Sequence, residues 1–169
     1  MTTPKDPDDL QKWAFLAQAP YRDAENPTIR AIADGLRAAA LGRAECFAHL
    51  ALALARDCVR YVRDVRRTGA EDIAGYTREP TERDPIDALA RGADDCDAKA
   101  RLFVALCLAG GLTARMRPKW DGPELAHVSA EVWLGGTWRH AETILARARL
   151  GDEHSQIPKE INTGCWRMS

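Results

Sequence analysis

Three residues, Cys96, His127 and Glu142, have the types and the order along the chain that covalent catalysis needs. A thiolate can act as a nucleophile, an imidazole can take the thiol proton, and a carboxylate can orient that imidazole. Cys96 lies in the segment DDCDAKARLFVALCLAGG, which is typical of a helix that begins with capping carboxylates and is buried nearly all round. Free backbone N–H groups and the helix dipole favour a thiolate at this first turn, so we predict that Cys96 is the nucleophile.

Asp94, Asp95 and Asp97 surround this cysteine. We interpret them as helix-capping carboxylates. Negative neighbours raise the pKa of a thiol, so the helix end alone cannot activate Cys96. A cationic imidazole is therefore needed beside it.

A β-hairpin can supply that imidazole. The segments HVSAEVWL and TWRHAETI alternate with period two, and Gly135-Gly136 between them suits a two-residue turn. Such a turn pairs Ser129 with Glu142, which makes His127 a diagonal neighbour of Glu142 on one sheet face, roughly 7–8 Å away between Cα positions. A glutamate side chain spans that gap, so we predict that Glu142 orients His127 and stabilises its cation.

His140 competes with His127 for the role of base, because it lies on the same face of the hairpin. The same register places His140 opposite Glu131 and farther from the start of the cysteine helix. We therefore favour His127 as the base, and we expect Ser129 and His140 to line the cleft beside it.

Helices are predicted ahead of this site. Capping residues and apolar spacing predict a short helix over about 8–17, a second over about 26–41 and a third over about 43–65. The third has one apolar face, formed by Phe47, Leu50, Leu54, Cys58, Tyr61 and Val65. The basic stretch RYVRDVRR is interpreted as the solvated end of this helix.

A long surface loop over 66–84 is expected next, and Asp84-Pro85 can then begin a short helix. After the cysteine helix, LTARMRP, HVSAEVWL and TWRHAETI have the period of antiparallel strands. The fold class is therefore α+β, with a helical N-terminal half packed on an antiparallel sheet. We expect a single domain over 1–169, with N-terminal helices at 7–41, a core at about 43–145 and an irregular segment at 146–169.

The composition excludes several classes of function. Lys and Arg number 24 against 25 Asp and Glu, a net charge of −1, so no global field favours nucleic acid or an anionic membrane. The sequence has no run of 18 apolar residues and no signal-peptide pattern. We therefore expect a cytoplasmic chain that is neither exported nor membrane-spanning.

Five cysteines, an odd number without tight spacing, indicate reduced thiols rather than a disulfide framework. We expect Cys46, Cys58 and Cys107 to be core residues and Cys165 to have no role. Cys46, His49 and Cys58 lie in one predicted helix without a second ligand pair, so we expect no metal site. No cofactor is expected either.

The ordered motifs resemble the transglutaminase-like superfamily, whose core carries a Cys at a helix N-terminus and then a His and an Asp on adjacent strands. DDCDAKARLFVALCLAGGLTARMRP is similar to its Cys helix and following strand, AHVSAEVWLGGTW to its His strand, and RHAET to its third strand. RYVRD and DPIDALARGADD are similar to its approach to the Cys. The resemblance covers about residues 50–145 and is closest to compact stand-alone members from bacteria and their phages. Asp94 replaces the usual Gly, and Glu142 replaces the usual Asp.

The resemblance implies a papain/transglutaminase-like core and acyl transfer, in which Cys96 attacks an amide bond of a protein or peptide and a thioester forms. It also implies an oxyanion site made by the Cys96 backbone N–H and one further donor, with Tyr61, Trp120 and Trp133 as alternatives. The competing interpretation is a catalytically idle fold that serves as a structural or assembly component, for example of a phage particle. The expected partners are thus a protein or peptide substrate or a larger protein assembly.

Overall fold

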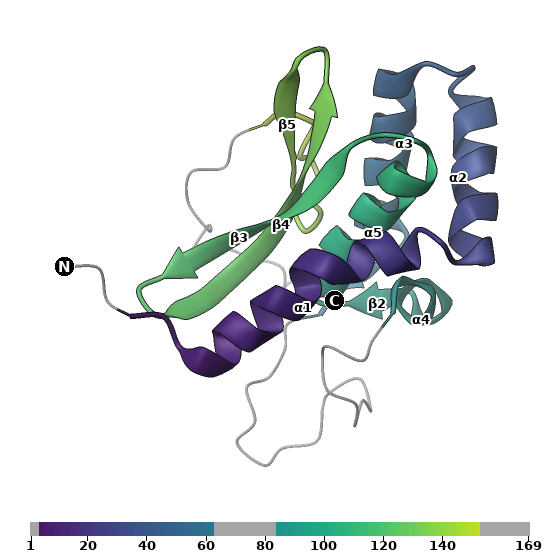
Figure 1. Ribbon diagram of the computed structural model, residues 1–169. Helices are drawn as coiled ribbons and strands as arrows, with labels where there is room; N and C mark the ends of the chain where they lie inside the picture. The colour runs from purple at the N-terminus through teal and green to yellow at the C-terminus, as the bar shows by residue number, and fades with distance from the viewer. Residues whose placement is uncertain (1–3, 63–83, 153–169) are drawn as a thin grey trace.

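The computed structural model describes residues 4–62 and 84–152, and it has helices first and a sheet last (Figure 1). The elements are α1 (Pro7–Asp23), α2 (Pro27–Ala39), α3 (Ala44–Asp57), β1 (Arg60–Tyr61), α4 (Pro85–Arg91), β2 (Ala93–Asp94), α5 (Cys96–Ala109), β3 (Ala114–Asp121), β4 (Glu124–Leu134) and β5 (Thr137–Ala141). Strands β3, β4 and β5 form an antiparallel sheet in that order, and α1, α3 and α5 pack against β4 (Figure 1). This is the predicted α+β fold.

Helix α5 is the centre of the core. Every residue from Asp97 to Cys107 is buried, and the helix contacts α1, α2, α3 and α4 as well as strands β3 and β4. The carboxylate of Asp95 caps its start and accepts a hydrogen bond from the Ala98 N–H at 3.0 Å. The predicted all-round burial is confirmed, and Cys96 is the first helical residue.

Helix α1 is longer than the predicted 8–17. It continues through Pro20 to Asp23, although a proline lacks the N–H that the helical ladder uses. Leu16, Ala19 and Pro20 are buried. Because α1 packs against α5, the buried surface of this extra turn offsets the missing hydrogen bond.

Helix α3 ends at Asp57, so the predicted continuation of the helix to about 65 is wrong. Arg60–Tyr61 form β1 instead, which pairs in parallel with Ala93–Asp94 of β2. This pairing places an extended segment beside the residues that precede the cysteine helix. A contact between residues so far apart in sequence has no signature in the local apolar spacing.

Alanines form much of the buried face of α3. The buried residues are Phe47, Ala48, Ala51, Leu52 and Ala55, whereas Leu50 of the predicted stripe keeps 36% of its surface exposed. Small side chains let α3 approach α5 closely. The Phe47 ring covers Gly110, where a Cβ would come within 2.2 Å of the ring. The predicted apolar stripe is therefore correct at Phe47 and wrong at Leu50.

The cysteines differ in burial. Cys107 is buried, Cys46 is half-buried against the core, and Cys58 is exposed because α3 ends just before it. The core prediction is therefore wrong for Cys58. Cys165 lies outside the described residues, as does the predicted loop over 66–84 except for its last residue. Asp84 caps α4, as predicted.

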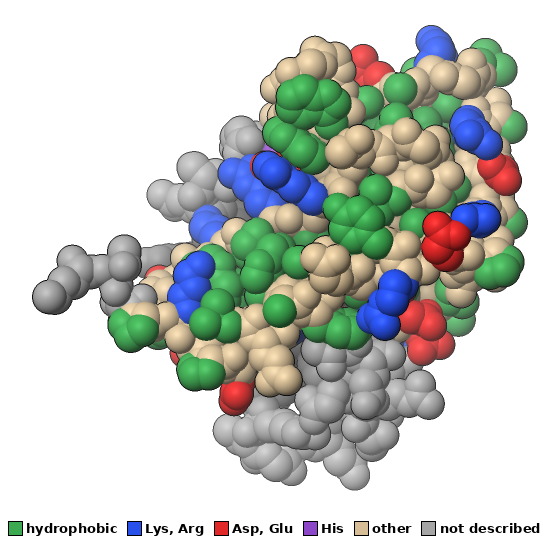
Figure 2. Space-filling view, viewed as in Figure 1, with side chains coloured by type: hydrophobic (Ala, Val, Ile, Leu, Met, Phe, Trp, Pro, Cys, Tyr) green, Lys and Arg blue, Asp and Glu red, His purple; other side chains and the backbone are tan. Residues whose placement is uncertain are grey.

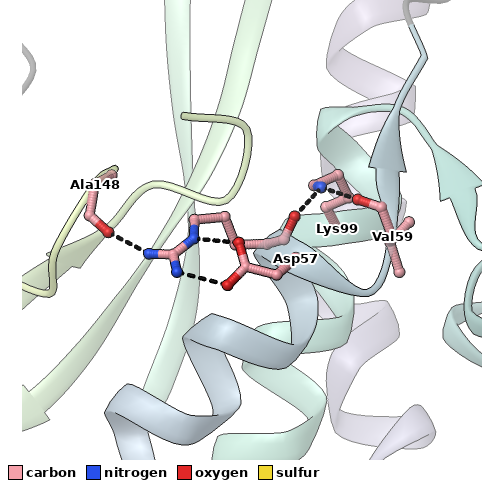
Figure 3. A network of polar contacts seen from close by, with 5 residues as sticks. Asp57, Val59, Lys99 and Ala148 are labelled. Atoms are coloured by element: carbon pink, nitrogen blue, oxygen red, sulfur yellow. Dashed lines mark hydrogen bonds and ion pairs between the residues drawn. The ribbon is translucent and has the colours of Figure 1, made fainter. Parts of the chain in front are cut away.

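Lys99 is buried in the core and belongs to a polar network that joins three parts of the fold (Figure 3). Its ammonium donates to the carbonyl of Arg56 in the last turn of α3 at 2.9 Å and to that of Val59 just after this helix. A buried ammonium needs such partners to offset its lost hydration. Arg56 pairs with Asp57 and donates to the Ala148 carbonyl at 2.7 Å, so the network extends to the segment after β5.

The hairpin of β4 and β5 has the predicted register. Gly135 and Gly136 both have positive φ, as a two-residue hairpin turn requires. Glu131 faces His140. Strand β5 ends at Ala141, so the following residue, Glu142, lies just past the strand.

The face of the molecule in Figure 2 carries its Lys and Arg side chains in small separate groups among apolar and acidic ones. This distribution agrees with the net charge of −1. Within residues 4–62 and 84–152, no helix has the length and apolar character that crossing a membrane requires.

Candidate active site

The thiol of Cys96 lies between its own helix and strand β4. The thiol donates to Oδ1 of Asp97 at 3.5 Å, and the backbone N–H of Val128 lies close enough to the sulfur to lower the pKa of the thiol. Burial raises the pKa of Cys96 well above its ordinary 9.0, and the charges of Asp97 and Asp95 raise it further. The Val128 N–H and the charge of Lys12 lower it. The thiol in this arrangement is therefore protonated at neutral pH, and it needs a base.

The end of strand β5 explains why the Val128 N–H can reach the thiol. Backbone N–H groups point to alternate sides along an antiparallel strand. The N–H of Trp133 donates to Thr113 on the β3 side at 2.8 Å, so the N–H of Val128 points to the β5 side. Strand β5 stops at Ala141, opposite Ala130. No residue of β5 therefore pairs with Val128, and its N–H is left to act on the nearby thiol.

His127 and Glu142 are in direct, buried contact, with 2.8 Å between Nε2 and Oε2. The second oxygen of Glu142 accepts from the Ile144 N–H at 3.1 Å. Burial alone would raise the pKa of Glu142, but the hydrogen bond and charge of His127, the Ile144 N–H and the charge of His140 hold it below its ordinary value. Glu142 is therefore an anion that fixes the imidazole. Because Nε2 faces Glu142, Nδ1 is the nitrogen that can take a thiol proton.

The structure thus brings His127 and Glu142 together as the hairpin register predicts. Both residues lie on one face, and the glutamate side chain spans the diagonal between them. Cys96 meets the same strand at Val128, the residue after His127. The catalytic roles of the three residues are proposals that this geometry supports.

His140, the alternative base, is engaged at both ring nitrogens. Nδ1 lies 2.8 Å from the Asp152 carbonyl oxygen and Nε2 lies 2.9 Å from the Ser129 hydroxyl. The carbonyl can only accept, so Nδ1 carries a proton, and Nε2 is hydrogen-bonded to the serine hydroxyl. This arrangement favours His127 as the base. Ser129 and His140 are a buried pair, and the prediction that they line an open cleft stays untested.

The carboxylates around Cys96 have different partners. Asp95 is the N-cap of α5, as predicted. The buried carboxylate of Asp94 pairs with Arg91 and accepts from the Asp95 N–H at 2.9 Å. Asp97 pairs with Lys12 of α1 at 2.5 Å. The capping interpretation is therefore correct for Asp95 and wrong for Asp97.

The three alternatives for the second oxyanion donor lie in different places. Trp133 is on β4 six residues beyond His127, about 20 Å along the strand, and it packs edge-on against Trp138 with 43% of its surface exposed. That prediction is wrong, because the distance is too long. Tyr61 pairs in register with Asp94, two residues before the nucleophile, and remains a prediction. Trp120, at the end of β3, also remains one.

Sequence reasoning missed two neighbours of the thiol, the Val128 amide and Lys12. A backbone amide has no side-chain signature. For Lys12 the available signal was an excess of carboxylates around a buried cysteine, which requires a cation from elsewhere in the chain. Among the residues that the structure describes, no group of three or more His, Cys, Asp or Glu side chains could hold a metal ion.

A cysteine at the start of a buried helix, packed on an antiparallel sheet that carries a histidine–carboxylate pair, defines the papain/transglutaminase-like class of α+β proteins. A family model described as the transglutaminase-like superfamily matches residues 57–143, half of the chain. The chain belongs to this superfamily. The matched range begins at the end of α3 and includes Cys96, His127 and Glu142. No curated protein and no solved structure matches the chain.

Proposed function

We propose that this protein is a cysteine enzyme that performs acyl transfer or hydrolysis on amide bonds of a protein or peptide. One observation carries the proposal. It is the buried contact of 2.8 Å between Nε2 of His127, on strand β4, and Oε2 of Glu142, just past strand β5. Such a pair supports base catalysis, because the carboxylate orients the ring and stabilises the imidazolium that forms. Membership of a superfamily that generally includes cysteine enzymes adds support.

In the proposed reaction, Nδ1 of His127 takes the proton of Cys96, and the thiolate attacks the carbonyl carbon of the amide. The Cys96 backbone N–H and a second donor meet the oxyanion. The C–N bond then breaks while His127 gives the proton to the leaving amine, and a thioester remains. Water or a second amine, deprotonated by His127, attacks the thioester and restores the thiol. Glu142 stabilises the imidazolium in both halves.

A second candidate function also has an observation in its favour. The thiol of Cys96 donates to Asp97, and burial and nearby carboxylates raise the pKa of Cys96. An idle site in a structural or assembly component, such as part of a phage particle, would retain a protonated cysteine of this kind. The cytoplasm is the proposed location of the enzyme, and association with a virion belongs to this second candidate.

Incubation with a panel of glutamine- and asparagine-containing peptides tests the enzyme proposal. Ammonia release, incorporation of a fluorescent primary amine and the mass of an acyl-enzyme would each report one half of the reaction. We expect at least one of these signals in the wild type and none in Cys96→Ser or His127→Ala. Wild-type protein that gives no signal with any peptide would favour the idle site.

A further inference from the structure

A buried carboxylate lies between the nucleophile and a lysine of the first helix. Asp97 is 4% exposed, its Oδ1 accepts from the Cys96 thiol at 3.5 Å, and its Oδ2 lies 2.5 Å from Lys12 Nζ. Lys12 belongs to α1, which packs against α5 (Figure 1). Helix α1 lies outside the residues 57–143 that match the superfamily. This cation is therefore supplied by a part of the chain beyond the matched core.

The ease with which the Cys96 thiol loses its proton depends on the charges of Asp97 and Lys12. Loss of the proton puts a second negative charge beside Asp97, where low water content makes the repulsion several times stronger than in bulk water. The charged groups that act on the sulfur are Asp95 and Asp97 from α5 and Lys12 from α1. Two carboxylates thus oppose ionisation, and Lys12 counters them.

We propose that Lys12 is a positioning residue of the active site, which pairs with Asp97 and so allows Cys96 to lose its proton. The inference rests on the proposed function of Cys96 as a nucleophile. Asp97 in turn keeps the lysine near the sulfur, because an unpaired lysine side chain extends into water. A merely structural ion pair between α1 and α5 would change stability, but it would not change the pH dependence of thiol reactivity.

The rate of Cys96 alkylation by iodoacetamide, measured on the full chain across pH by peptide mass spectrometry, separates these roles. Lys12→Gln should move the reactivity profile to higher pH and slow alkylation near pH 8 by about three- to tenfold. Lys12→Arg keeps the charge and should restore the wild-type profile. Arg22→Gln removes a charge from the same helix ten residues away, about 15 Å, and should leave the profile unchanged.

A second pair of variants tests the coupling. Asp97→Asn removes the repelling charge and should move the profile to lower pH. In that background Lys12→Gln should have little further effect, because the lysine is no longer held beside the sulfur. Such non-additivity is expected only of residues that act together.

The outcomes distinguish the inference from the function on which it rests. A folded Lys12→Gln protein with the wild-type profile overturns the inference and leaves the proposed function standing. If Lys12→Gln does not fold, Asp97→Asn decides, and an unchanged profile there overturns the inference. If wild-type Cys96 reacts no faster than exposed Cys58 and is indifferent to His127→Ala, the proposed function and the inference both fail.

Discussion

Replacing Glu142 with glutamine should disable His127 and leave the hairpin folded. The carboxylate has two contacts, His127 Nε2 at 2.8 Å and the Ile144 N–H at 3.1 Å. If the amide oxygen of the glutamine keeps the Ile144 contact, its NH₂ group donates to Nε2. Nδ1 then carries the imidazole proton and cannot take one from the thiol. If the amide is reversed, its NH₂ group faces the Ile144 N–H. Two donors then face each other, and no hydrogen bond forms between them.

The expected loss is large in activity and moderate in stability. An asparagine in place of the orienting aspartate of a serine-protease triad lowers kcat by about 10⁴, because the histidine has the wrong tautomer. We therefore expect acyl transfer to fall by about 10²–10⁴. A buried hydrogen bond to a charged group contributes about 1.5–3 kcal/mol, and we expect the free energy of unfolding to fall by a similar amount. Glu142→Asp keeps the charge on a side chain shorter by about 1.5 Å and should retain part of the activity.

The assay compares amine incorporation and ammonia release in wild type, Glu142→Gln and Glu142→Asp, with thermal unfolding as the check on folding. Glutamine as active as glutamate would refute the reasoning. Another group would then have to orient His127. A backbone carbonyl would be the next candidate, because the Ser129 hydroxyl is already hydrogen-bonded to His140.

Three further predictions concern the nucleophile, the core and pH. Cys96→Ser should abolish turnover with little change in thermal midpoint, because the exchange is nearly isosteric; a large drop would mean a structural cysteine. Gly110→Ala should lower the free energy of unfolding by about 1–3 kcal/mol, since its Cβ would lie 2.2 Å from the Phe47 ring, whereas Gly35→Ala, with open space around it, should raise it by about 0.5–1 kcal/mol. Equal changes in the free energy of unfolding for Gly110→Ala and Gly35→Ala, measured by denaturant titration, would contradict this packing. The pKa of Glu142 is held below its ordinary 4.5, so its stabilising contribution is present above that pH and is lost as pH falls through the folded pKa. The stability difference between wild type and Glu142→Gln should therefore shrink toward zero in acid, and a constant difference would contradict the shift.

Local rules were sufficient for the parts of the site that lie close in sequence. The Gly135-Gly136 turn sets the hairpin register, and the register sets the contact between His127 and Glu142. The carboxylate cap at Asp95 and the apolar run after it are likewise local, and they predict the helix that begins at the cysteine. Each of these features is specified by residues that lie close together in the sequence.

Features set by distant contacts could not be predicted in this way. Helix α3 ends at Asp57, and Arg60–Tyr61 then pair with a strand that lies beyond the residues 63–83. Helix α1 continues through Pro20 because α5 buries that turn. Lys12 reaches Asp97 only through the crossing of α1 and α5. In each case a tertiary contact outweighs or supplements the local preference.

Labelling with a thiol-directed electrophile, followed by peptide mass spectrometry, tests most directly whether Cys96 and His127 act as nucleophile and base. The proposed chemistry predicts rapid modification confined to Cys96, faster than at the exposed Cys58, and loss of that reactivity in His127→Ala. Slow and equal modification of Cys46, Cys58 and Cys96 in both proteins would contradict it.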